Sequence, residues 1–145
     1  MRKRATHRRL PTHAPTLVKL YADPTLAARE HMALTLLQSG AASGGQFNIL
    51  LDCADLLLLA AHEKRTADVL EIAHLGRTAL ANVQERFAAR GKLGATGEEL
   101  KALRVLLDVS EDFWKRQSGA LFAEALEALA KYRRHQADAN KSTTA

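Results

Sequence analysis

Aromatic residues, cysteine and proline are all scarce in this sequence. Phe, Trp and Tyr make up only 5% of its 145 residues, so a core must be built mainly from Leu, Ala, Val and Ile. That composition favours helices, because strands are enriched in β-branched and aromatic side chains. The one cysteine, Cys53, cannot form a disulfide within the chain. A lone thiol is typical of a reducing compartment, so we predict a cytoplasmic protein.

Long hydrophobic runs are missing as well. The most apolar stretch, residues 49–61, is interrupted by Asp52 and Asp55. It is therefore shorter than the apolar run that a membrane-spanning helix needs. The basic N-terminus is not followed by the apolar core of a secretory signal. We therefore expect no membrane partner. An apolar fraction of 47% is typical of a folded domain rather than a disordered chain.

Positive charge is concentrated at the two ends of the chain. Residues 1–22 contain basic side chains and no acid, and residues 131–145 contain four basic residues against Asp138. The formal net charge of +5 therefore divides into +6 for the first segment, −4 for the body and +3 for the last segment. The high isoelectric point comes from the ends, and the body is mildly acidic.

Helix start and stop signals are clear in the first half of the chain. Asp23 followed by Pro24 predicts an N-cap and a first helix, which Ser39 and the next glycine end. Residues 40–45 are interpreted as a flexible connector. The second helix is predicted over 46–62, with apolar side chains on so wide an arc that it must contact several neighbours. It is predicted to be the central helix.

Capping signals define two further helices. Thr66 is a suitable N-cap and Gly91 a suitable C-cap for a third helix, whose apolar residues share one face. Thr96 and Glu99 have the spacing of a capping box, which predicts the start of a fourth helix. Its apolar residues keep one phase as far as Arg134, so this helix is predicted to be long.

These elements predict an all-α fold, a four-helix bundle of the up-down type with a long C-terminal helix. The predicted organisation is a disordered or extended basic arm over 1–22, the bundle over 23–134 and a polar tail over 135–145. A break of the fourth helix near Ser118–Gly119 is left open, because glycine weakens a helix there.

Glu71 and His74 have the Glu-x-x-His spacing of di-metal carboxylate bundles. The apolar face of their helix lies almost opposite both residues, so we expect them to face water. We therefore predict no metal site, no cofactor, no catalytic residues and no small-molecule substrate. A small metal-binding bundle is the least favoured alternative.

Residues 71–83 resemble a bacterial helix-turn-helix in the order of an alanine, a glycine and an aliphatic residue. However, Ala73 and Gly76 are three residues apart rather than four, and the apolar face continues through Gly76. We predict instead a continuous helix in which another helix approaches closely at Gly76.

The basic ends favour a non-enzymatic accessory or regulatory protein that binds nucleic acid or another polyanion. The residues that we expect to contact phosphates are Arg2, Lys3, Arg4, Arg8, Arg9, Lys131, Arg133 and Arg134. The alternative is an adaptor or inhibitor that binds only proteins. A second apolar face on the fourth helix predicts a homo-oligomer or protein partner there. Its expected interface residues are Val105, Leu106, Val109 and Phe113. Heavy use of Ala, Leu and Arg favours a bacterial or phage protein.

Overall fold

The described part of the chain, residues 24–143 of a computed structural model, is entirely helical outside its turns. It confirms the all-α prediction. The helices are α2 (Pro24–Ser39), α3 (Gly44–Glu63), α4 (Ala67–Arg90), α5 (Gly97–Lys115) and α6 (Gly119–Thr143). The predicted arm, residues 1–22, lies outside the described residues.

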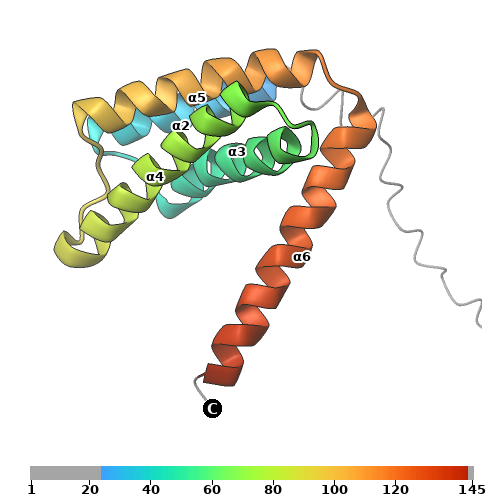
Figure 1. Cartoon of the computed structure of the whole chain (residues 1–145). Coiled ribbons are helices and arrows are strands. Elements are labelled where there is room, and N and C mark those ends of the chain that lie inside the picture. The colour runs from blue at the N-terminus through green and yellow to red at the C-terminus, as the bar shows by residue number, and fades with distance from the viewer. Residues whose placement is uncertain (1–23, 144–145) are drawn as a thin grey trace, which may run out of the picture.

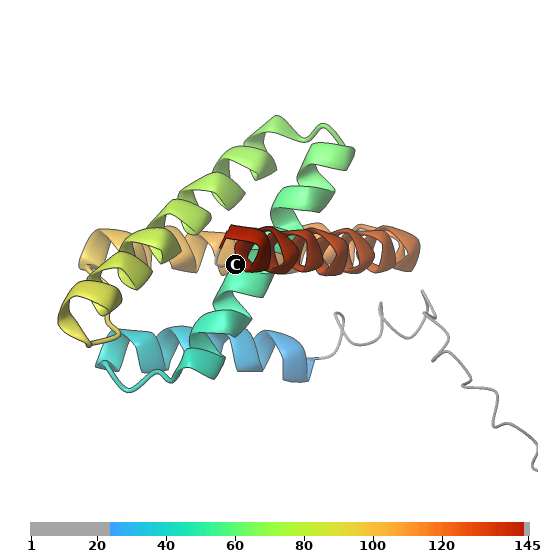
Figure 2. The same ribbon diagram turned by 90° about the horizontal axis from the view of Figure 1, so that it is seen from below.

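α3 is the central helix, as its wide apolar arc predicts. It packs against α2, α4, α5 and α6 (Figure 2). By length and composition alone α3 could also cross a membrane, since its most apolar window has a mean hydropathy of 1.3. This corrects our expectation that the acids at positions 52 and 55 leave no such segment. Because α3 contacts every other described helix, it is arranged as a core helix.

A capping box that we did not predict begins α3 two residues early. The Ser43 hydroxyl accepts a hydrogen bond from the backbone N–H of Gln46, whose side chain accepts one from the backbone of Ser43. The flexible connector therefore shortens to the few residues before Ser43. The predicted cap at Gly91 is confirmed, with φ of 69° in the left-handed region that favours glycine.

α4 and α5 form a close pair. α4 runs unbroken through Gly76, which confirms the continuous helix over the segment that resembles a helix-turn-helix. A Cβ atom built on Gly76 would lie 2.8 Å from Cδ2 of Leu106, so the two helices meet where glycine leaves room. At the other end, Arg86 of α4 forms an ion pair with the buried carboxylate of Glu99 on α5.

The predicted count of four helices is not confirmed, because the long C-terminal helix is interrupted at residues 116–118. The break falls where we left one open. Ser118 accepts a hydrogen bond from the backbone N–H of Leu121 and so acts as a cap for α6. α6 then continues to Thr143, which corrects the predicted polar tail over 135–145.

α6 gives the molecule its shape. The other four helices pack together, whereas α6 turns away from the end of α5 and passes across α3 into open space (Figures 1 and 2). The start of α2 and the start of α6 lie toward the same end of the molecule, and the far end of α6 points away from it (Figures 1 and 2). An up-down arrangement of neighbouring helices is therefore not confirmed.

The core contains one polar pair. The thiol of Cys53 on α3 lies 3.4 Å from the hydroxyl of Ser110 on α5, and both residues are buried. Burial of Cys53 agrees with its place on the apolar face. Phe87 and Tyr132 share the apolar phase of their helices but are exposed.

Candidate nucleic-acid interface

The first half of α6 buries side chains against the body, whereas every residue of its second half is exposed. Its buried apolar side chains are Leu121, Phe122, Ala125 and Leu129, and α3 is the main neighbour of the helix. The ring of Phe122 meets that of Trp114 edge-on, with centroids 4.8 Å apart. From residue 130 to residue 143 every residue is exposed. The buried contact of α6 with the body therefore ends at Leu129.

Arg133 joins α6 to an acidic pair on α3. One of its guanidinium nitrogens lies 2.6 Å from Oδ1 of Asp52 and 3.4 Å from Oδ2 of Asp55. Asp55 also forms an ion pair with Arg77 of α4, with Nε and Oδ1 2.9 Å apart. Partial burial lowers the pKa of Arg133, but the two carboxylates raise it by more, so its net shift is upward. Asp52, Asp55, Arg77 and Arg133 form one cluster that links three helices.

This cluster was not predicted. Helical phase places Asp52 and Asp55 on the polar side of their helix, but it does not show that a base 78 residues after Asp55 covers them. Arg133 lies four residues after Leu129 and therefore on the same, inward face of α6. Phosphates would therefore compete for Arg133 with the carboxylates of Asp52 and Asp55, with which it already forms ion pairs.

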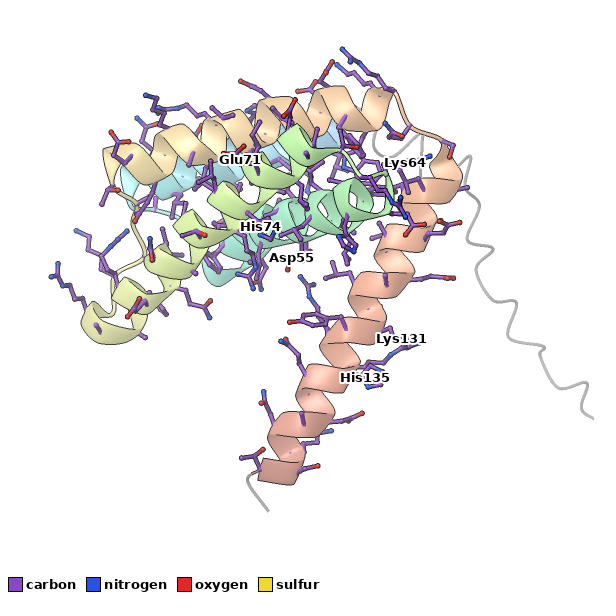
Figure 3. All side chains as sticks on the ribbon, in the orientation of Figure 1. Asp55, Lys64, Glu71, His74, Lys131 and His135 are labelled. Carbon is purple, nitrogen blue, oxygen red and sulfur yellow. The ribbon has the colours of Figure 1, made fainter. Side chains whose placement is uncertain are left out.

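Lys131 and Arg134 lie on the outward face of the same helix. Both are exposed, and neither forms an ion pair with another described residue. Figure 3 shows Lys131 and His135 extending away from α3 and α4. Positions 131, 134, 138 and 141 follow one helical stripe, which holds three bases and one acid, Asp138.

The exposed half of α6 has the charge to bind a polyanion. Residues 130–143 contribute +3 to the formal charge, beside a body of −4. Lysine and arginine on an exposed helix face can neutralise phosphates and release their counterions. Arg133 joins this half to α3 on the inward side, so an extended polymer has access to the outward face.

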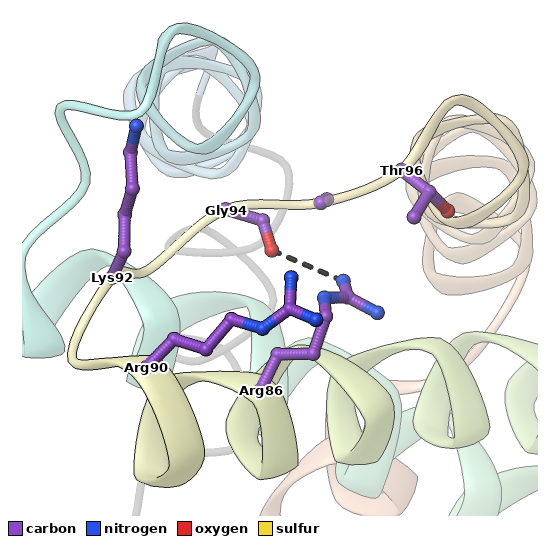
Figure 4. Close-up of a pocket in the computed structure, with 6 residues that line it drawn as sticks. Arg86, Arg90, Lys92, Gly94 and Thr96 are labelled. Carbon is purple, nitrogen blue, oxygen red and sulfur yellow. Dashed lines mark hydrogen bonds between the residues drawn. The ribbon is translucent and has the colours of Figure 1, made fainter.

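A second basic site, missed from the sequence, lies where α4 turns into α5. Arg86, Arg90 and Lys92 line a cavity of about 300 Å³ there (Figure 4). Arg86 is already engaged, since it donates hydrogen bonds to the Glu99 carboxylate and to the backbone carbonyl of Gly94, at 2.8 and 3.2 Å. An anion would meet mainly Arg90 and Lys92, beside the acidic first turn of α5. This corner is therefore less suited to a polyanion than α6.

The predicted interface residues divide between the core and the surface. Leu106 and Phe113 are buried within the chain, Val109 is partly buried, and Val105 is exposed. Helical phase identified the second apolar face of α5. In the structure α3 and α4 cover part of this face, which the sequence alone does not show. Only Val105 of the four is well placed to meet another molecule.

The metal-like spacing on α4 leads to no cluster. Glu71 and His74 are both exposed, as predicted (Figure 3). Among residues 24–143, no three side chains of His, Cys, Asp or Glu come together as metal ligands do.

The five predicted phosphate-binding residues of the arm, Arg2 to Arg9, lie outside the described residues. Comparisons of the chain with protein-family models, with curated proteins and with solved structures find no match in any of the three.

Proposed function

We propose that this chain is a non-enzymatic helical accessory protein that binds nucleic acid through the outward face of α6, together with the basic arm. One observation carries the proposal: α6 extends fourteen residues beyond its last buried side chain, and this exposed part is basic while the body is acidic. An unpacked half-helix of this kind contributes little to the core. Its charge therefore needs another explanation, and a polyanionic partner supplies one.

The dimensions of α6 are compatible with duplex nucleic acid. The exposed half of the helix is about 21 Å long and, with side chains, about 10–12 Å wide. The major groove of B-DNA is about 12 Å wide, so either the groove or a phosphate ridge can receive the helix. With Lys131, Arg134 and the arm as the main contacts, we expect binding through phosphates with little sequence preference.

The experiment is fluorescence anisotropy with labelled duplex DNA and with RNA, at low salt, on the full chain. We expect the double variant Lys131→Ala with Arg134→Ala to bind about tenfold more weakly than the wild type. The control, Arg29→Ala with Lys64→Ala, removes the same charge from exposed positions on the body. We expect it to bind within about twofold of the wild type.

An arm variant with alanine at Arg2, Lys3, Arg4, Arg8 and Arg9 separates the two contributions. Equal weakening by the α6 variant and the control would mean that net charge alone matters, and the α6 face would be rejected. No binding of either nucleic acid by the wild type would reject the whole proposal in favour of a protein-interaction module. The exposed groove between α4 and α5 is the observation that favours that second candidate.

A further inference from the structure

An apolar groove lies between α4 and α5. Its volume is about 390 Å³. Residues of both helices line it: Ile72, Leu75, Thr78, Glu98, Lys101, Ala102 and Val105. It lies between two helices that meet tightly at Gly76 and Leu106, so its walls are fixed by the core.

Two large apolar side chains protrude beside this hollow. Leu75 is 56% exposed and Val105 is 43% exposed, and each comes from a different helix. Ile72 and Ala102, which are partly buried, continue the apolar surface between them. The protruding leucine and the hollow beside it provide a projection and a recess on one surface.

The polar rim of the groove carries one charge of each sign. Glu98 and Lys101 are both exposed, and neither forms an ion pair with another described residue. The rim is therefore neutral, although residues 23–130 together carry −4. A two-fold axis places the same patch of each copy against the other, so an interface of this type must complement itself. A neutral rim with one acid and one base meets that requirement.

We propose that a second copy of this chain docks on the α4–α5 groove, with Leu75 of each copy entering the recess of the other and Glu98 facing Lys101 across the two-fold axis. The occupant is a second copy because recess, projection and opposite charges all lie on one patch. A strongly basic or acidic partner would find no matching charge on this rim. The proposal goes beyond nucleic-acid binding and does not depend on it.

The test is the molar mass of the full chain, measured by light scattering after size exclusion across the micromolar range, without nucleic acid. We expect a dimer at the upper end. Leu75→Glu and Val105→Glu each place a carboxylate in the contact and should raise the dissociation constant about tenfold or more. Met32→Glu and Phe87→Glu change residues that are 59% and 46% exposed outside the groove, and they should leave the dimer intact.

A charge exchange makes the test specific for the two-fold pairing. Glu98→Lys alone should weaken the dimer, because lysines then face each other. The double variant Glu98→Lys with Lys101→Glu should restore it, since every pair across the axis is again of opposite sign. Circular dichroism of each variant checks that the helices remain folded.

A wild type that stays monomeric throughout the range would overturn the proposal. So would a dimer that survives Leu75→Glu and Val105→Glu, or one that the two control variants weaken equally. A double charge variant that stays as weak as Glu98→Lys would reject the two-fold pairing of the rim. None of these results depends on whether the chain binds nucleic acid.

Discussion

At the scale of single residues, Gly76 decides how closely α4 and α5 can approach. Leu106 is fully buried, and both its Cδ2 and its Cβ atoms lie within 3.2 Å of the position that a Cβ on residue 76 would occupy. Rotating the leucine about χ1 moves Cδ2 but not Cβ, so a tight contact of 3.2 Å remains. A glycine in mid-helix normally weakens a helix by about 1 kcal/mol relative to alanine, and the close approach accounts for its presence here.

Gly76→Ala should therefore destabilise the protein, although alanine is the better helix former. We expect a net loss of about 1–2 kcal/mol in the free energy of unfolding, measured by urea denaturation. Gly97→Ala is the matched control, because nothing lies within 4 Å of its added Cβ. A Gly76→Ala variant as stable as the wild type would show that the two helices separate at little cost.

Glu99 makes stability depend on pH. Its hydrogen bonds with Arg86 are the main cause that lowers the pKa of this carboxyl below its ordinary value of 4.5, although burial acts in the opposite direction. A lowered pKa in the folded state contributes stability that is present above pH 4.5 and is lost as the pH falls through the folded value.

Glu99→Gln should lower the free energy of unfolding by about 2 kcal/mol at neutral pH, because it breaks a charged hydrogen-bond pair. The difference from the wild type should shrink as the pH falls from 4.5 through the lowered pKa of the folded state, where the wild-type carboxylate becomes protonated. Denaturation curves at several pH values measure both effects. Glu85→Gln, at an exposed position of α4, is the control. A difference that stays constant from pH 7 down to acid would contradict this role of the carboxylate.

At the scale of helices, capping explains what could be predicted and what was missed. Thr96 begins α5 as its spacing with Glu99 predicts. Ser43 begins α3 with the same kind of capping box, and the Ser118 hydroxyl caps α6 by accepting a hydrogen bond from the backbone N–H of Leu121. In all three cases the residue after the cap is a glycine. We interpreted Gly44 as part of a connector and Gly119 as a weak position within a helix. Glycine alone does not distinguish a break in a helix from the first residue of one.

α6 shows what the sequence does not predict. Its apolar phase runs on from α5 with almost no change, so the turn at 116–118 leaves little trace in the periodicity. The docking of α6 on α3 depends on pairs far apart in the chain, such as Arg133 with Asp55. Long-range pairs of this kind need the tertiary arrangement, whereas caps and faces are local.

Arg133→Ala should loosen α6. The ion pairs to Asp52 and Asp55 are partly exposed, so we expect a loss of only about 1 kcal/mol, but most of it should fall on α6. Hydrogen exchange should become faster in residues 119–129 and remain unchanged in α4. Arg134→Ala removes the same charge from the outward face and serves as the control. Equal exchange in the two variants would show that the acidic pair does not hold the helix.

At the scale of the whole molecule, charge is separated by position. The sequence alone located the basic ends and the acidic body. It did not show that Arg133 faces inward or that Lys131 and Arg134 face outward, because that distinction depends on which side of α6 meets α3. On α6 the candidate site therefore consists of Lys131 and Arg134, whereas the predicted set also included Arg133.

The central claim is that Lys131 and Arg134 contact phosphates. The most direct measurement is the slope of the logarithm of the DNA-binding constant against the logarithm of salt concentration. Each phosphate contact on duplex DNA contributes about 0.9 to the magnitude of that slope. The Lys131→Ala and Arg134→Ala double variant should therefore lower it by about 2 units. A slope equal to that of the wild type would contradict the claim.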